Sequence, residues 1–167
     1  MKTLTVLLLI SFLLTACRHT YYVVRHAEKG VAVPGEAMTS PDNPKLSPAG
    51  EKRAEKLKEI LKDKKIAYIF STNTIRTITT AEPLATSLGI TVEKYPARPD
   101  SAFIRKLRRL KKNVLIVGHS NTVDDIVNGL TGEQSIPGDL QDSEYDNLFV
   151  ITYKGRKVTF ERQKFNP

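Results

Sequence analysis

The sequence predicts an α/β protein with a single three-layer domain, in which a largely parallel central sheet has helices on both faces and a hairpin at its C-terminal end. Apolar segments of strand length alternate along the chain with segments of helical periodicity. The 167 residues are 40% hydrophobic and 26% charged, which is enough apolar material for one well-filled core. No internal repeat or linker indicates a second domain.

Four segments have the composition of buried strands: residues 21–24, 66–70, 91–95 and 114–117. Helical segments separate them, which is typical of parallel strands joined by crossover connections. Near the C-terminus, the segments NLFVITY and KVTFERQ flank Lys154 and Gly155 and predict two strands joined as a hairpin.

Four helices are expected, at residues 47–62, 75–88, 103–110 and 123–130. Ser47 followed by Pro48 is typical of a helix start, because the serine side chain caps free N–H groups and proline suits the first helical position. Gly89 is expected to end the second helix, and Pro83 to kink it.

The N-terminal segment has the pattern of a signal peptide, with Lys2 before an apolar run over residues 4–14 that is short for a membrane span. The LTAC motif that ends it resembles the bacterial lipobox. This resemblance implies that residues 1–16 are removed and that Cys17 is lipidated; an ordinary secretory signal before a free cysteine is the alternative. We therefore expect residues 17–167 to form a domain anchored to a membrane of the bacterial cell envelope, outside the cytoplasm.

Only residues 18–20 separate Cys17 from the first expected strand, so the domain should lie close to the membrane. His19 is expected to belong to a surface linker. Cys17 is the only cysteine of the chain, which excludes an intrachain disulfide and metal sites built from several cysteines.

The chain has 26 Lys and Arg against 18 Asp and Glu, a net charge of +8. Such an excess is typical of proteins that bind nucleic acid, an anionic membrane or an anionic substrate. The densest basic segments, EKRAEKLKEILKDKK and RKLRRLKK, alternate with leucine at helical spacing, and no basic patch with interleaved aromatic residues occurs. We interpret these segments as solvated helix faces and expect no nucleic-acid partner.

Basic side chains follow three of the predicted strands, at the ends that meet along one edge of a parallel sheet. Arg25 and His26 follow the first strand, Arg76 lies shortly after the second, and His119 follows residues 114–117. Guanidinium groups, imidazoles and helix N-termini at one place favour an anion such as phosphate. The alternative for each residue alone is a structural role, such as a hydrogen-bonded core histidine.

Four motifs span nearly the whole mature chain: RHAEK, LSPAGEKRA, STNTIRTITTAEPLA and VGHSNT. Together they resemble the histidine phosphatase superfamily, the phosphoglycerate mutase-like fold, in its small phosphatase branch. The resemblance implies a phosphatase that uses neither metal nor cofactor, in which His26 is phosphorylated during the reaction. It also implies that Arg25 and Arg76 hold the phosphoryl oxygens and that His119 completes the pocket.

Ser120 and Asn121 belong to the same motif as His119, and we expect them to contact the substrate. The general acid that protonates the leaving group is less well defined. Many relatives have a glutamate after the middle helix, and here the segment TVEKYPARPDS offers Glu93 and Asp100. Glu28, next to the nucleophile in the sequence, is a third candidate.

The loop over residues 29–45 is long for a compact domain and directly follows the nucleophile, so we expect a lid facing the substrate, with plain disorder as the alternative. The substrate is expected to be a phosphorylated small molecule or a phosphoprotein. Phosphohistidine is included because its good leaving group demands less of a general acid. Two alternatives remain, an inactive module that binds a phosphorylated ligand and a phosphoglycerate-type mutase, although the short chain leaves little room for the insertions of mutases.

Overall fold

The computed structural model describes residues 18–30 and 43–167. In these ranges the strands are β1 (Arg18–Arg25), β2 (Ile66–Ser71), β3 (Val92–Lys94), β4 (Asn113–Gly118), β5 (Asn147–Lys154) and β6 (Lys157–Lys164). The helices are α1 (Pro48–Leu61), α2 (Ile75–Leu88), α3 (Ser101–Leu110) and α4 (Val123–Thr131). Residues 1–17, including Cys17 and the predicted lipobox, lie outside the described part, as does most of the predicted lid.

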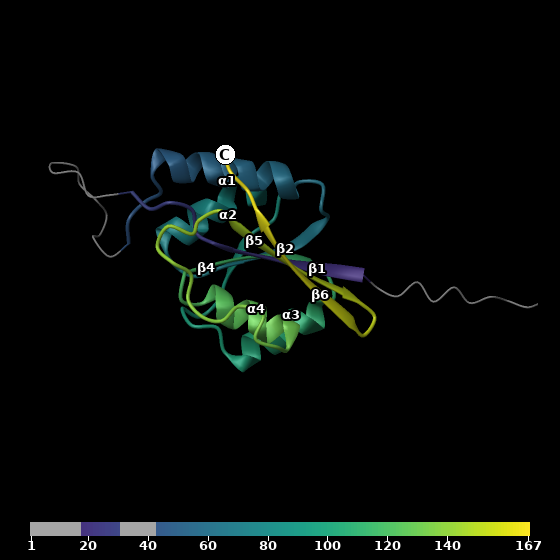
Figure 1. Cartoon of the computed structure of the whole chain (residues 1–167). Coiled ribbons are helices and arrows are strands. Elements are labelled where there is room, and N and C mark those ends of the chain that lie inside the picture. The colour runs from purple at the N-terminus through teal and green to yellow at the C-terminus, as the bar shows by residue number, and fades with distance from the viewer. Residues whose placement is uncertain (1–17, 31–42) are drawn as a thin grey trace, which may run out of the picture.

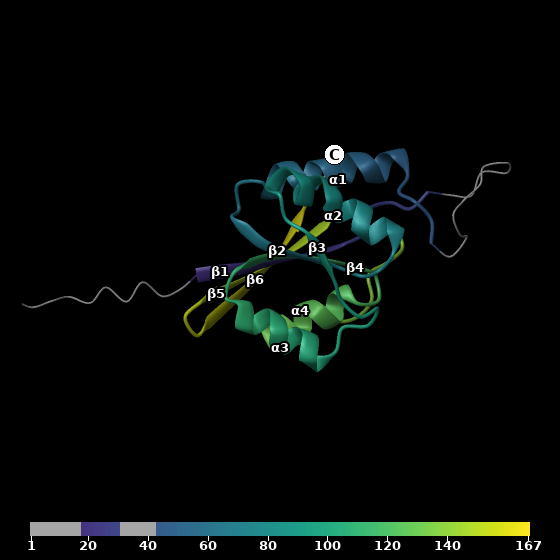
Figure 2. The same ribbon diagram turned by 180° about the vertical axis from the view of Figure 1, so that it is seen from behind.

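The strands form one sheet in the order β3-β2-β4-β1-β5-β6. β3, β2, β4 and β1 are parallel, whereas β5 is antiparallel to β1 and β6 is antiparallel to β5. Helices α1 and α2 cover one face of this sheet, and α3 and α4 cover the other (Figures 1 and 2). The predicted fold class, three layers with a largely parallel sheet and a C-terminal hairpin, is therefore confirmed.

The two cores follow from the alternation of side chains along the strands. Tyr21 and Val23 of β1 are buried against α3 and α4, in a cluster with Phe103, Leu107 and other apolar residues. Tyr22 and Val24 point to the opposite face, into a cluster with apolar residues of α1 and α2. Every residue of β1 except Arg18 is buried, because the strand has neighbours on both sides and helices on both faces.

The helix boundaries agree closely with the local sequence signals. Ser47 precedes α1 and its hydroxyl accepts a hydrogen bond from the Gly50 N–H at 3.1 Å, with Pro48 as the first helical residue. α2 ends at Gly89, which has a φ of 65° in the left-handed region that glycine adopts without strain. The predicted hairpin also forms, and Gly155 provides the positive φ that its turn requires.

The start of β1 differs from the sequence prediction. The strand begins at Arg18, three residues earlier than expected, and pairs with β5 from there on. His19 is consequently not a surface linker: it is 7% exposed and its ring stacks on Tyr153 with centroids 5.0 Å apart. Residues 18–20 are thus part of the sheet and provide no spacer after position 17.

In the described ranges, none of the helices combines the length and the apolar character needed to cross a membrane.

Candidate active site

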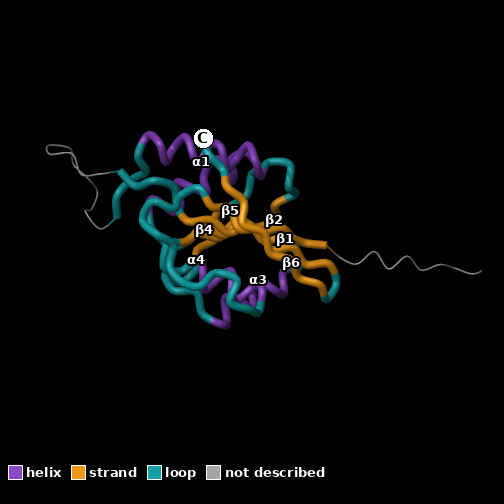
Figure 3. The backbone as a smooth tube through the Cα atoms, viewed as in Figure 1, coloured by secondary structure: helices purple, strands orange, loops and turns teal. Residues whose placement is uncertain are grey.

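A cavity of about 810 Å³ lies where the carboxyl ends of β1, β2 and β4 meet. β1 and β4 are neighbours, and the His26 N–H donates a hydrogen bond to the Gly118 carbonyl at 2.8 Å. The loops that leave these strands gather at this end of the sheet, as Figure 3 shows. The cavity is lined by Arg25, His26, Lys29, Gly30, Pro44, Thr74, Arg76, Ala97, Arg98, His119, Ser120, Asn121 and Asp142.

His26 is held as a neutral imidazole with one defined tautomer. Its Nδ1 lies 2.8 Å from the Ala27 carbonyl oxygen. Because a carbonyl only accepts, Nδ1 carries the proton and Nε2 keeps its lone pair. Burial lowers the pKa of His26 to about 3, helped by the charges of Arg76 and Arg25 and outweighing the opposing hydrogen bond to Ala27. At neutral pH the ring is therefore unprotonated and suited to act as a nucleophile.

His119 lies next to His26, with ring centroids 5.4 Å apart and ring planes at 66°. Its Nδ1 is 3.5 Å from Nη2 of Arg76, and its Nε2 is 2.8 Å from the Thr72 hydroxyl. A guanidinium only donates, so Nδ1 is the acceptor and Nε2 donates to Thr72. Burial, followed by the charges of Arg76 and Arg25, lowers the pKa of His119 to about 4.

Arg25 is fixed by the loop that precedes β5. Its Nη1 donates to the carbonyls of Gln141 at 2.8 Å and Asp142 at 3.2 Å, and its Nη2 donates to the Tyr145 hydroxyl at 3.3 Å. The Tyr145 ring also lies under the guanidinium, with its centroid 4.1 Å from Cζ. These contacts from several directions hold Arg25 in one orientation beside the nucleophile.

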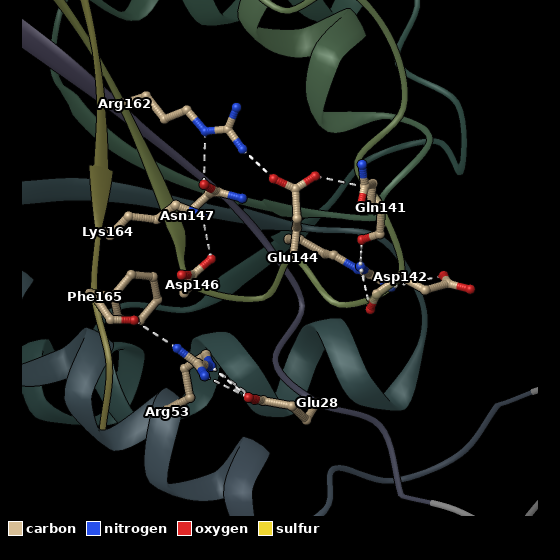
Figure 4. Close-up of polar contacts among 11 residues, drawn as sticks. Glu28, Arg53, Gln141, Asp142, Glu144, Asp146, Asn147, Arg162, Lys164 and Phe165 are labelled. Atoms are coloured by element: carbon tan, nitrogen blue, oxygen red, sulfur yellow. Dashed lines mark hydrogen bonds and ion pairs between the residues drawn. The ribbon is translucent and has the colours of Figure 1, made fainter.

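The same loop is tied to the edge strand β6, as Figure 4 shows. Arg162 of β6 forms an ion pair with Glu144 and donates to the Asn147 side chain at 2.9 Å. The other carboxylate oxygen of Glu144 accepts the Gln141 N–H at 2.9 Å. Gln141 in turn accepts from Arg25, so the hairpin supports the position of this arginine indirectly.

Glu28 does not line the cavity; its carboxylate faces Arg53 of α1 (Figure 4). Nε of Arg53 lies 2.9 Å from both carboxylate oxygens and Nη2 lies 2.6 Å from one of them. Partial burial raises the pKa of Glu28, but the hydrogen bonds and charge of Arg53 outweigh burial and lower it overall. Glu28 is thus ionised and engaged at neutral pH, which disfavours it as an acid.

The other two expected acids also lie outside the cavity lining. Asp100 caps α3 by accepting the Phe103 N–H at 2.8 Å, and Glu93 pairs with Lys106 at 3.0 Å. Of the described residues that line the cavity, Asp142 is the one with a carboxylate. Its side chain is fully exposed, and one carboxylate oxygen lies 3.6 Å from Nη2 of Arg25. The structure therefore brings the expected histidines and arginines together, but none of the three expected acids joins them.

Several residues that line the cavity or contact its arginines were not predicted from the sequence. Arg98 adds a further positive charge, and Asp142 and Tyr145 reach Arg25 from the loop before β5. A topological signal for that loop exists, because an antiparallel strand next to β1 must begin at the edge where β1 ends. The predicted contact residues Ser120 and Asn121 do line the cavity.

The ends of the 29–45 loop also reach the cavity. Lys29, Gly30 and Pro44 line it, and the two ends of the loop are held together because the Gly30 N–H donates to the Lys45 carbonyl at 2.8 Å. Residues 31–42 lie outside the described residues, so the lid stays a prediction. In the described part of the chain, no group of three or more His, Cys, Asp or Glu side chains is arranged to hold a metal ion.

Comparison with known proteins places these features in a family context. The family model described as "Histidine phosphatase superfamily (branch 1)" matches residues 21–97, which include Arg25, His26 and Arg76. His119 lies beyond the matched segment. No curated protein matches the chain by sequence.

Solved structures share the fold over nearly the whole chain. A protein assigned as the phosphohistidine phosphatase SixA from Agrobacterium tumefaciens is 21% identical, with a TM-score of 0.61, and the alignment covers 89% of this chain and 98% of the other. A protein histidine phosphatase SixA complexed with tungstate is 18% identical, with a TM-score of 0.64 and coverage of 87% and 96%. Phosphoglycerate mutase from Bacillus anthracis is 15% identical, with a TM-score of 0.60 and coverage of 89% and 94%.

At these identities the structural neighbours establish the fold alone, while the family model adds the sequence pattern around the first strand and α2. The chain is therefore similar to the histidine phosphatase superfamily over residues 21–97, and it shares its fold with the solved structures over nearly its whole length.

Proposed function

We propose that the protein is a phosphatase that transfers a phosphoryl group from its substrate to Nε2 of His26 and then to water. The observation that carries this proposal is the state of His26. Its Nδ1 proton is directed to the Ala27 carbonyl and its pKa is lowered to about 3, so Nε2 offers a lone pair to the cationic cavity.

The reaction has two displacements at phosphorus. The Nε2 lone pair forms a P–N bond while the bond from phosphorus to the leaving oxygen or nitrogen breaks. A water molecule then attacks phosphorus, the P–N bond breaks, its electron pair returns to Nε2 and inorganic phosphate is released. Arg76, next to His119, stabilises the negative charge on the phosphoryl oxygens together with Arg25, which the loop before β5 holds in place.

The proposed substrate class depends on which carboxyl groups are free to act as a general acid. Since Glu28, Asp100 and Glu93 are engaged elsewhere, we propose a substrate whose leaving group needs little protonation. A phosphohistidine side chain meets this requirement, because a protonated imidazole leaves as a neutral ring. The two SixA proteins among the structural neighbours, whose names describe histidine phosphatases, are consistent with this substrate.

We also propose that Cys17 carries a lipid anchor and that the domain acts at the bacterial cell envelope, outside the cytoplasm. The support is the sequence alone: an apolar segment over residues 4–14 followed by LTAC. Metabolic labelling with a radioactive fatty acid tests this proposal. Incorporation should occur in the native protein and be absent from Cys17→Ser; label retained in that variant would contradict it.

The test of the reaction is phosphate release from p-nitrophenyl phosphate, from an alkyl phosphate and from a phosphohistidine peptide. His26→Ala should abolish turnover of all three while the unfolding midpoint shows that the domain is folded. Protein quenched during turnover should carry phosphate that is labile in acid and stable in alkali. Turnover by His26→Ala at near the native rate would refute the mechanism, and preference for the alkyl phosphate would refute the substrate class.

Two reagents, vanadate and a chelator, complete the test. Vanadate resembles the five-coordinate phosphoryl group in transit and should inhibit, whereas a chelator should leave the rate unchanged. A strict requirement for an added divalent ion would contradict the proposed chemistry.

A further inference from the structure

The edge of the sheet opposite the candidate active site carries a cluster of basic side chains that we call the basic edge. Parallel strands β2, β4 and β1 begin at this edge, and the antiparallel β5 brings the β5–β6 turn to it (Figures 1 and 2). The basic edge consists of Arg18, Lys64, Lys65, Lys111, Lys112, Lys154, Arg156 and Lys157.

Backbone pairing and one asparagine hold these turns together. Arg18 is directly opposite Lys154 across β1 and β5, and Lys154 is opposite Lys157 across the hairpin. The Asn113 side chain accepts the Thr20 N–H at 2.8 Å and donates to the Lys64 carbonyl at 2.7 Å. The basic residues therefore belong to one rigid surface and not to independent flexible loops.

The charges of the basic edge are not neutralised within the described residues. All eight side chains are exposed and none forms an ion pair there. Basic residues elsewhere do have partners, such as Lys106 with Glu93 and Lys164 with Asp146. The α1–β2 turn, the α3–β4 turn and the hairpin turn, all within the described residues, contain one acidic residue, Asp63.

Two of these lysines occupy strained positions. Lys65 has a φ of 51° and Lys111 a φ of 48°, in the left-handed region that favours glycine. Glycine occupies comparable positions at Gly89 and Gly132. Glycine would adopt these backbone angles without strain. The presence of lysine at both turns is therefore consistent with a requirement for positive charge on this surface.

We propose that the basic edge docks on the surface of an anionic lipid bilayer. Four strand spacings separate β2 from β6, so the charges extend over about 19 Å along the tips of adjacent turns, a shape suited to a plane of headgroups. The described chain begins at Arg18 on this edge, so the N-terminal segment, with its apolar residues 4–14, is connected to the domain at this edge. That continuity favours a bilayer over a nucleic acid as the anionic partner.

Docking in this way sets the direction of the active site. β1 runs from the basic edge to the cavity over eight residues, a rise of about 23 Å. With the basic edge on the bilayer, Arg25 and His26 lie at the far end of the strand and open to the aqueous phase. The distance exceeds the Debye length of roughly 8 Å at physiological salt, so the lipid charge scarcely affects an anionic substrate at the cavity.

The experiment uses a chain that begins at Arg18, which retains the whole sheet and both helix layers. Its partitioning is measured by sedimentation with phosphatidylcholine vesicles, with and without phosphatidylglycerol. A test variant, K64Q/K112Q/K157Q, removes one charge from each turn. A control variant, K52Q/K56Q/K94Q, removes three exposed lysines from α1 and from the opposite end of β3.

The native domain should bind the anionic vesicles, release them in high salt and leave neutral vesicles unbound. Each basic residue near a charged membrane contributes about five-fold to partitioning, so the test variant should bind on the order of 100-fold more weakly. The control variant, with the same net charge, should lose less than about three-fold. Both variants should hydrolyse p-nitrophenyl phosphate at the native rate, since their residues lie outside the cavity lining.

The same variants are also made in the full-length chain. The ratio of binding to anionic and to neutral vesicles then shows whether the effect persists when the N-terminal segment is present. Equal losses in the test and control variants would refute a docking surface and reduce the effect to net charge. The proposal would also be overturned if the domain bound neutral vesicles as strongly as anionic ones. It would be overturned, too, if double-stranded DNA displaced the domain from vesicles at a much lower concentration of charge than free anionic lipid does.

Discussion

Arg53→Met should destabilise the domain by roughly 3 kcal/mol, because it leaves the Glu28 carboxylate without its partner beside the active site. Arg53 donates to Glu28 through Nε and Nη2, and to the Phe165 carbonyl through Nη1 at 2.7 Å. Removing one member of a buried ion pair costs 3–5 kcal/mol on the usual scale. The Glu28 side chain is 23% exposed and water can reach it, which puts the estimate at about the lower limit of that range.

The assay is urea unfolding at pH 7 for the native protein, Arg53→Met, Glu28→Gln and the double variant. Glu28→Gln keeps an acceptor for Arg53 and should cost only about 1–2 kcal/mol. The double variant should cost less than the sum of the single changes, because methionine no longer leaves a charge unpaired. Additive effects, or a loss below about 1 kcal/mol in Arg53→Met, would refute the inference that the Glu28 carboxylate depends on Arg53 as its partner.

The pH dependence gives an independent check. The pKa of Glu28 is lowered in the folded protein, so the ion pair contributes its full stability above the unfolded pKa of about 4.3. This contribution is lost as the pH falls through the folded-state pKa. The difference in unfolding free energy between the native protein and Arg53→Met should therefore shrink in acid, and a constant difference down to low pH would contradict the argument.

Substitutions of Arg162 and Arg76, and the pH dependence of activity, test the site further. Arg162→Met removes the ion pair to Glu144 and should raise the KM for p-nitrophenyl phosphate up to about five-fold with little change in kcat, as expected for a partly exposed pair. Lys164→Met is the control: it breaks a neighbouring ion pair on the same strand and should leave KM unchanged. Arg76→Ala should lower kcat/KM on the order of 100-fold, and Arg76→Lys should recover only part of it, since an ammonium lacks the guanidinium fork. Because protonated His26 has no lone pair on Nε2, activity is lost as pH falls through its pKa of about 3, and Arg76→Ala should move this acidic limb to higher pH by removing a charge that lowers the pKa. An unchanged acidic limb in that variant would show that Arg76 does not act on His26.

Features with local causes were predictable from the sequence. Ser47 and Pro48 mark the start of α1 because capping depends on residues within one turn, and Gly89 marks the end of α2 because few other residues adopt its backbone angles. The convergence of His26 and His119 was also predictable, since parallel strands joined by helices must end at the same edge.

Features that depend on distant partners were not predictable. Arg53 belongs to a segment that the sequence suggested was a solvated helix face. Its side chain is buried instead, because it pairs with Glu28, which is 25 positions away in the chain. His19 was expected in a linker and is buried because Tyr153 on β5 lies beside it. Tyr145 gave no signal of its own, because its role depends on Arg25 reaching across from another strand.

The position of β1 has a consequence for how the chain matures. β1 is the first of the described strands along the chain but lies between β4 and β5 in the sheet. Its Thr20 is bonded to Asn113, 93 positions later, and to Thr152, 132 positions later. Partners so distant make loop closure slow and leave the central strand without neighbours until most of the chain exists. For the exported, lipid-anchored protein that we propose, this arrangement would delay folding until export is complete, because the sheet cannot close around β1 before its distant partners have been synthesised.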